Sequence, residues 1–162
     1  MTGVRGEITG GTSGPTLAIL GELDSLIVSE HPHADSDTGA AHACGHHCQI
    51  GMLYGAALAL SQAGILPELS GRLIFMAVPA EEYIEIEYRD TLRRDGKIEF
   101  LGGKPELIKL GEFDDVNLAM MLHTTSSPAE RQLCLSGTNN GTVAKKIQFI
   151  GRGAHVCDRR LC

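Results

Sequence analysis

The sequence predicts an α/β fold, a sheet with helices packed against it. Three short segments, residues 16–20, 73–78 and 118–122, are continuously apolar, as strands covered on both faces are. The segments between them have helical periodicity or helix-ending residues. A length of 162 residues fits one domain, or one domain and part of another.

The first half of the chain predicts two strands around a helix. Residues 1–15 are rich in Gly and Thr and indicate a turn or an edge hairpin before the apolar strand 16–20. Residues 49–63 have apolar side chains at helical spacing, and Gly64 is placed to end that helix. Apolar residues also occupy its other side, so we expect this helix to be largely buried. Residues 73–78 give the strongest strand signal in the chain.

The second half predicts two further helices and two strands. Residues 83–95 are charged and favour a solvated helix without chemistry of its own, and residues 105–110 indicate a short helix. The apolar segment 118–122 is the third buried strand. After a turn at 137–141, the alternating pattern of residues 142–150 predicts a half-exposed strand.

Composition excludes several classes of partner. The net charge of −6 argues against nucleic acid or an anionic membrane surface. The sequence shows no signal-peptide pattern and no apolar run long enough to span a membrane. The five cysteines form no C-x-x-C pair, which favours reduced thiols and a cytoplasmic location over a disulfide framework.

One short segment, His-Ala-Cys-Gly-His-His at residues 42–47, concentrates a thiol and three imidazoles. Cys44 and His46 are two positions apart, so an extended or looped backbone places them on the same side. Both are ligand types that zinc-like cations prefer. The following helix N-terminus is expected to favour the Cys44 thiolate. The alternative is a polar loop that happens to be rich in histidine.

Further candidate ligands follow the three predicted strands. Glu22 and Asp24 come after the first strand, Glu81 and Glu82 after the second, and His123 directly after the third. In open α/β sheets, ligands and catalytic groups gather beyond the carboxyl ends of the strands. Three such strand ends, together with the Cys-x-His segment, therefore predict one metal site.

The residue types suggest two roles within that site. Cys44, His46, His123 and one carboxylate would suit zinc, manganese or cobalt. Of two adjacent glutamates, one can bind metal while its neighbour takes a proton from water whose pKa the metal lowers. For Glu81 and Glu82 the alternative is a charged helix start, where acidic residues favour the helix dipole.

The remaining histidines and cysteines are expected to lie outside the ligand set. We interpret His31 and His33 as loop residues, and His42 and His47 as flanking the site. The other cysteines have no partner at metal-ligand spacing and are expected to be buried or free thiols: Cys48, Cys134, Cys157 and Cys162.

Several motifs in this order resemble a family of metallo-amidohydrolases and peptidases. His-Ala-Cys-Gly-His at 42–46, Pro-Ala-Glu-Glu at 79–82 and Leu-His at 122–123 resemble the group of aminoacylase and carboxypeptidase G. The branch most similar contains indole-acetyl-amino-acid, hippurate and aminobenzoyl-glutamate hydrolases. Residues 21–26 resemble the family's Asp-Ala-Leu segment, and residues 151–155 resemble a lid segment that carries an active-site histidine.

The resemblance implies a domain organisation. It implies a zinc-exopeptidase-like mixed sheet with flanking helices, of which residues 1–136 form the partial metal-binding catalytic domain. Residues 137–162 would be the truncated start of a lid and dimerisation domain. Members of the family are much longer, which makes this chain resemble an internal fragment.

The resemblance also implies a role for each site residue. Glu81 would be the general base. Asp24 would support the ligands from behind, and His155 would bind substrate or stabilise the tetrahedral intermediate, often across a dimer interface. Two divalent ions (Zn, Mn or Co) would be bound per full-length subunit. The implied metal ligands are Cys44, His46, Glu82 and His123.

The implied activity is hydrolysis of the amide bond of N-acyl amino acids or small dipeptide-like substrates, in full-length relatives that form homodimers. Two alternatives remain. A last metal-binding histidine and most of the lid have no counterpart here, which favours an inactive fragment that at most binds metal or a partner. In a thiol hydrolase Cys44 would be the nucleophile, which leaves Glu81, Glu82 and His123 without a role.

Overall fold

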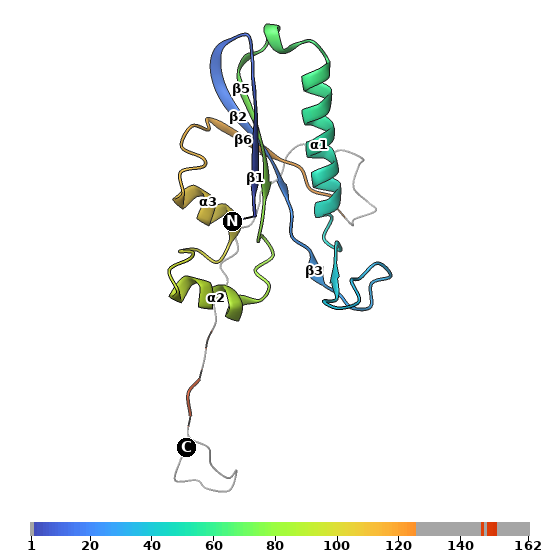
Figure 1. Cartoon of the computed structure of the whole chain (residues 1–162), viewed down its shortest axis with the longest axis vertical. Helices are drawn as coiled ribbons and strands as arrows, with labels where there is room; N and C mark the ends of the chain where they lie inside the picture. Colours follow the sequence, from blue (N-terminus) through green and yellow to red (C-terminus); the bar gives the residue numbers. More distant parts are fainter. Residues whose placement is uncertain (1, 126–146, 148, 152–162) are drawn as a thin grey trace, which may run out of the picture. The chain divides into compact units, whose positions relative to one another are not determined.

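A computed structural model of the chain describes residues 2–125, 147 and 149–151. Figure 1 shows the elements in their spatial arrangement. In chain order they are β1 (Val4–Thr9), β2 (Thr12–Glu22), β3 (Leu26–Ile27), β4 (Ala40–Ala41), α1 (His46–Gln62), the 3₁₀ turn η1 (Leu66–Glu68), β5 (Ser70–Val78), α2 (Ile86–Arg94), α3 (Gly103–Lys109) and β6 (Leu118–Met121).

Four strands form a mixed sheet in the order β1-β5-β2-β6. Strand β2 is parallel to both β5 and β6, and β1 is antiparallel to β5. The predicted α/β class with a mixed sheet is therefore confirmed. Strands β3 and β4 form a separate antiparallel pair.

The N-terminal residues form the edge strand β1. The prediction of a hairpin is wrong, because β1 pairs with β5 and not with β2. The connection between β1 and β2 passes the start of β5, where the amides of Gly10 and Gly11 donate hydrogen bonds to the carbonyls of Gly71 and Leu66. A Cβ atom on Gly11 would lie 2.1 Å from the Pro67 carbonyl oxygen. Glycine thus permits this close crossing.

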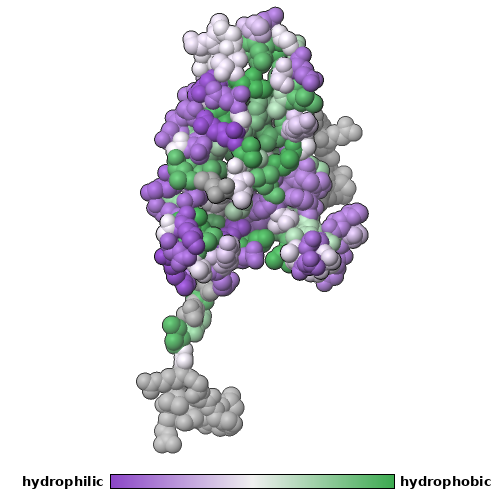
Figure 2. Space-filling view, in the orientation of Figure 1, coloured by the Kyte–Doolittle hydropathy of each residue, from purple (hydrophilic) through white to green (hydrophobic). Residues whose placement is uncertain are grey.

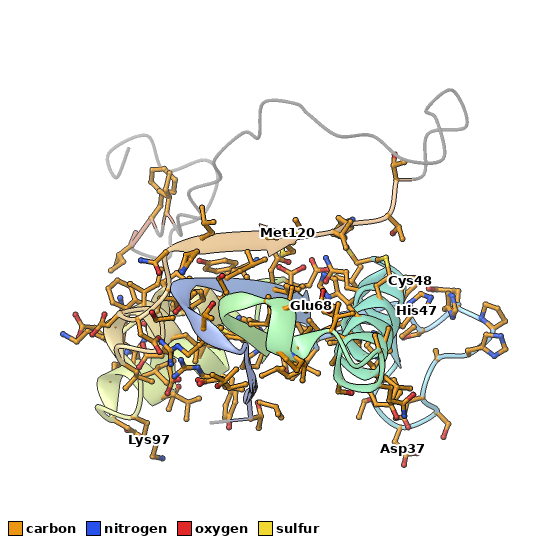
Figure 3. The ribbon with its side chains drawn as sticks, turned by 90° about the horizontal axis from the view of Figure 1, so that it is seen from above. Asp37, His47, Cys48, Glu68, Lys97 and Met120 are labelled. Atoms are coloured by element: carbon orange, nitrogen blue, oxygen red, sulfur yellow. The ribbon has the colours of Figure 1, made fainter. Side chains whose placement is uncertain are left out.

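The two faces of the sheet are covered by different helices. Figures 1 and 3 show α1 on one side of the sheet and α3 on the other. The alternate residues that face α3 form the buried core with Leu107 of that helix. Its members on β2 and β5 are Ala18, Leu20, Ile74, Met76 and Val78. The central position of β5 thus agrees with its continuous apolar sequence.

Two apolar elements are more exposed than their sequences predicted. Helix α1 buries only its narrow sheet-facing side, with His46, Gln49 and Leu53. Tyr54 on its outer side is 69% exposed, and Figure 2 shows hydrophobic side chains at the surface over α1 and the sheet beside it. Strand β6, which carries Met120 in Figure 3, is an edge strand and is exposed throughout. Predicted burial of α1 and β6 is therefore wrong for the part of the chain that is described.

The chain divides into two compact units, residues 1–131 and 132–162. The predicted domain boundary at 136–137, the turn at 137–141 and His155 lie outside the described residues. The strand predicted at 142–150 is described only at 147 and 149–150, which are exposed and have no strand assignment. Among the described residues, no helix combines the length and apolar character that crossing a membrane requires.

Candidate functional site

The carboxyl ends of the parallel strands bring the predicted site residues together. Strand β2 ends at Glu22, β5 leads into Glu81 and Glu82, and β6 is followed closely by His123. The start of α1 adds His46, whose Nε2 lies 3.1 Å from Glu22 Oε2. The juxtaposition expected from the parallel arrangement is present in the structure.

Gly45 sets the geometry of the Cys-Gly-His segment. It is the residue before α1 and has φ 104° and ψ 4°, a left-handed conformation that favours glycine. A Cβ atom here would lie 2.1 Å from Thr124 Oγ1. The backbone can therefore turn tightly between Cys44 in the loop and His46 in the first helical turn, while lying against the segment after β6.

His46 is buried and presents one free ring nitrogen. Its Nδ1–H donates to the backbone carbonyl of Asp24 at 2.8 Å, so Nε2 is the atom able to bind a cation. Around Nε2 lie Oε2 of Glu22 at 3.1 Å, Oε1 of Glu82 at 3.6 Å and Oε2 of Glu81 at 4.0 Å. An imidazole lone pair and three carboxylates thus converge on one point.

His123 repeats this arrangement on the other side of the site. Its Nδ1–H donates to the backbone carbonyl of Thr124 at 2.7 Å, and its Nε2 lies 3.6 Å from Cys44 Sγ. The rings of His46 and His123 are edge to face, with centroids 5.9 Å apart. A histidine that donates one ring N–H to a carbonyl and keeps the other nitrogen free is typical of metal ligands.

These donors fit a divalent transition metal. Two groups have ligand atoms within 4.8 Å of one another: Cys44, His46 and His123, and Glu22, His46 and Glu81. His46 Nε2 and Glu82 Oε1 are buried and have no hydrogen-bond partner among the described residues. Buried polar atoms without partners are costly, so their convergence here agrees with a bound cation. Thiolate, imidazole and carboxylate donors suit zinc, manganese or cobalt.

The backbone around Glu81 and Glu82 is held in a sparsely populated conformation. Ala80 has φ 62° and Tyr83 has φ 52°, and each non-glycine residue in this region costs about 1 kcal/mol or more. The Glu82 amide donates to Asp24 Oδ2 at 2.8 Å. The Glu82 side chain is 16% exposed and that of Glu81 is 36% exposed. Glu82 is thus more buried than Glu81, which is half-buried.

Two groups of the site, the Cys44 thiol and the Glu81 carboxyl, have a raised pKa. The pKa of the Cys44 thiol is raised to about 11 by its hydrogen bond with Glu82, by burial and by the charges of nearby glutamates. The Cys44 pKa is thus raised, whereas the position before a helix N-terminus was expected to favour the thiolate. Burial, followed by the charge of Glu22, raises the pKa of Glu81, and Lys104 opposes this shift.

Lys104 is a site residue that sequence reasoning missed. It lies in the first turn of α3, and its Nζ forms an ion pair with Glu22 Oε1. The amide of Glu22 donates to Gln49 Oε1 at 2.9 Å. The sequence holds no signal for the contact between Lys104 and Glu22, because the two residues are 82 positions apart. Helix α3 lies on the side of the sheet opposite α1.

The other histidines and cysteines in the described part of the chain lie outside the two ligand groups. His31 and His33 contact each other in the loop, as predicted. The rings of His42 and His47 lie 5.9 Å apart. Cys48 is a free, exposed thiol next to His47 at the start of α1 (Figure 3).

Asp24 contacts two of the candidate ligands. Its backbone carbonyl fixes the His46 ring and its Oδ2 holds the Glu82 amide. Its Oδ1 lies 3.5 Å from His46 Nδ1. Asp24 thus orients two candidate ligands from behind without facing His46 Nε2.

Comparisons with known proteins agree with this geometry. The chain is 28% identical over 160 residues to N-acetyl-L-cysteine deacetylase of Bacillus subtilis (strain 168), a match that covers 96% of this chain and 34% of the relative. It is 32% identical over 162 residues to Thermostable carboxypeptidase 1 of Saccharolobus solfataricus, covering 95% of this chain and 36% of that protein. The chain thus spans about a third of the length of these curated relatives.

A solved structure shares the fold. The YXEP protein of Bacillus subtilis, described as a dinuclear metal binding peptidase from the M20 family, superposes with a TM-score of 0.58 at 28% sequence identity. The superposition covers 76% of this chain and 30% of that protein. The sequence model of Peptidase family M20/M25/M40 matches residues 18–134, which include both ligand groups. On this match, the chain belongs to peptidase family M20/M25/M40.

Proposed function

We propose that this chain carries the metal-binding and acid–base residues of a metal-dependent amidohydrolase that acts on N-acyl amino acids. The observation that carries the proposal is the environment of His46 Nε2, a free imidazole nitrogen faced by the carboxylates of Glu22, Glu81 and Glu82. Neighbouring Cys44 and His123 add a second set of donors. Such a mixed set matches a pair of divalent ions better than an ordinary ion-pair network.

The residues of the chain would have separate roles as metal ligands, supporting residues and general base. We assign Cys44, His46, Glu82 and His123 as ligands of zinc, manganese or cobalt. When bound, the metal would polarise the substrate carbonyl and lower the pKa of water. The carbonyl and carboxylate of Asp24 keep His46 and Glu82 in place.

We assign Glu81 as the general base. Its carboxylate is more exposed than that of Glu82, so an incoming substrate can reach it. Glu81 would take a proton from water as the water oxygen adds to the amide carbon. It would return that proton to the nitrogen when the C–N bond breaks, releasing a carboxylic acid and the free amine of an amino acid.

The substrate class follows from the relatives. N-acetyl-L-cysteine deacetylase is named for removing an acyl group from an amino acid, and a carboxypeptidase releases an amino acid from an amide bond. Both reactions cleave an amide next to an amino-acid carboxylate. We therefore propose N-acyl amino acids and small dipeptide-like molecules as substrates.

The test is amide hydrolysis by the purified chain with added Zn²⁺, Mn²⁺ or Co²⁺. N-acetyl amino acids and dipeptides are incubated with wild type and Glu81→Gln, and release of free amine is measured. Turnover that needs both metal and Glu81 would support the proposal. Turnover that is insensitive to chelators and abolished by Cys44→Ser would instead indicate a thiol hydrolase.

A second candidate function is metal binding without turnover. His123 is exposed in the described part of the chain. An open site leaves water in place and weakens electrostatic stabilisation of the transition state. Wild type that binds metal but releases no amine would favour this candidate.

The compartment and assembly of the protein are part of the same proposal. Cys44 and Cys48 are free thiols, and a cysteine ligand requires the reduced form. We therefore propose a cytoplasmic protein. The homodimer expected for full-length relatives, and the substrate-binding role of His155, remain predictions.

A further inference from the structure

Glu22 is a buried carboxylate that the assigned ligand set does not use. Its side chain is only 2% exposed, and its Oε2 lies 3.1 Å from His46 Nε2, nearer than either Glu81 or Glu82. Its backbone amide is fixed by the Gln49 side chain. The carboxylate is therefore aimed at the free nitrogen of His46 and held there.

The charges around Glu22 are not balanced. Lys104 pairs with Glu22 Oε1, whereas Oε2 is the oxygen of Glu22 that lies 3.1 Å from His46 Nε2. Among the described residues, no other lysine or arginine has an ion pair with Glu22, Asp24, Glu81 or Glu82. One lysine cannot neutralise the carboxylates of Glu22, Asp24 and Glu82, whose side chains are 2%, 13% and 16% exposed. A second positive charge facing His46 Nε2 would complete the balance.

His46 also has only one lone pair to offer. It belongs to both ligand groups, the one with Cys44 and His123 and the one with Glu22 and Glu81. Its Nε2 is 3.1 Å from Glu22 Oε2, and its Nδ1 is occupied by the Asp24 carbonyl. One nitrogen cannot serve two ions, so the two groups must separate when both are filled.

We propose that Glu22 is a metal ligand that binds one cation together with His46, while Cys44 and His123 bind the other. Lys104 is a positioning residue, which holds the second oxygen of Glu22 and fixes the direction of the first. This inference rests on the proposed function, since it needs the chain to bind two divalent ions. It assigns those ions different surroundings, one rich in carboxylates and one containing a thiolate.

The two sites can be observed separately with Co²⁺. Thiolate coordination gives an intense sulfur-to-cobalt charge-transfer band, which carboxylate and imidazole ligands do not give. In wild type, we expect this band to saturate when one equivalent is bound, while calorimetry detects a second equivalent. Cys44→Ser should abolish the band, which separates the Cys44 signal from that of exposed Cys48.

The decisive variant is Glu22→Gln, which keeps the shape of the side chain and removes its charge. We expect it to weaken binding of one Co²⁺ at least about tenfold while the thiolate band keeps its full intensity. The matched control is Glu99→Gln, which breaks the exposed pair of Glu99 with Lys109 on the same helix as Lys104. This control should bind both ions as wild type does.

Glu22→Asp is a second test variant in case Glu22→Gln does not fold. It keeps the negative charge beside Lys104. Its carboxylate is shorter by one methylene, so we expect Co²⁺ affinity at the carboxylate site below wild type, with an unchanged thiolate band. Circular dichroism of each variant checks the fold.

Three results separate the possible failures. Wild type that binds no Co²⁺ would contradict the proposed function itself. Wild type that binds two ions, with both Glu22 variants binding them equally well, would overturn only the assignment of Glu22. Loss of the thiolate band in folded Glu22→Gln would also overturn it, because Glu22 would then support the whole site rather than one ion.

Discussion

Replacing Gly45 with alanine tests how the backbone forms the site. Gly45 has φ 104°, where a residue with a Cβ atom costs about 1–3 kcal/mol. The new Cβ would also lie 2.1 Å from Thr124 Oγ1, but 3.4 Å from Thr124 Cβ. Rotation of the threonine side chain can relieve the first contact, so the backbone term dominates. We expect Gly45→Ala to lower the free energy of unfolding by about 2 kcal/mol.

The same change should damage metal binding more than it damages the fold. Relaxation of the strained backbone at residue 45 would displace Cys44 relative to His123, whose Sγ and Nε2 atoms are 3.6 Å apart. We expect Co²⁺ affinity to fall at least about tenfold, as for other losses of ligand positioning. Adding Thr124→Ala should restore little stability, because it removes the side-chain contact and leaves the backbone strain.

Gly51→Ala is the matched control. Gly51 lies inside α1, and a Cβ atom there meets nothing within 4 Å. Alanine at a helix interior is more favourable than glycine by about 0.5–1 kcal/mol. Urea unfolding should therefore show Gly51→Ala at or above wild-type stability and Gly45→Ala below it. Equal stability and equal Co²⁺ affinity in both variants would refute the argument about Gly45.

Two further predictions concern the glutamates and the charged edge of the sheet. In a full-length relative with this motif, Glu81→Gln should lose on the order of 10²-fold in turnover and keep its metal, whereas Glu82→Gln should lose metal as well. Normal turnover of the Glu81 variant would refute the assignment of Glu81 as base and Glu82 as ligand. Hydrogen bonds from Arg5 and Arg72 lower the pKa of Asp115 below its ordinary value of 3.8. These hydrogen bonds should stabilise the fold at neutral pH, and this stabilisation should be lost as the pH falls through the folded-state pKa of Asp115. Urea unfolding should therefore show Asp115→Asn less stable than wild type at neutral pH. The difference in unfolding free energy should shrink in acid. A difference that grows in acid would contradict this sign.

The sequence predicted the central strands, and which candidate site residues lie together, because those signals are local. Strand β5 is continuously apolar and central, and the Cys-x-His segment supplies two donors at fixed spacing. The parallel strands then bring their carboxyl ends together. Cys44, His46 and His123 were thus predictable as neighbours before their contacts were known.

What the sequence missed depends on contacts between distant segments. The start of α1 was placed three residues late, because Gly45 ends the loop through its backbone and offers no side-chain cap. Pairing of β1 with β5 depends on how closely Gly10 and Gly11 approach η1 and β5. The role of Lys104 appears only when α3 has packed on the sheet.

The central claim is that this cluster binds a divalent cation, and elemental analysis tests it most directly. Untagged wild type, Cys44→Ser and His46→Ala are purified in parallel. Cys48→Ser is the control, because Cys48 is an exposed thiol at the start of α1. We predict bound zinc, manganese or cobalt in wild type and Cys48→Ser, and a sharp loss in the other two variants. Equal metal content in all four proteins, or none in wild type after incubation with these ions, would contradict the account.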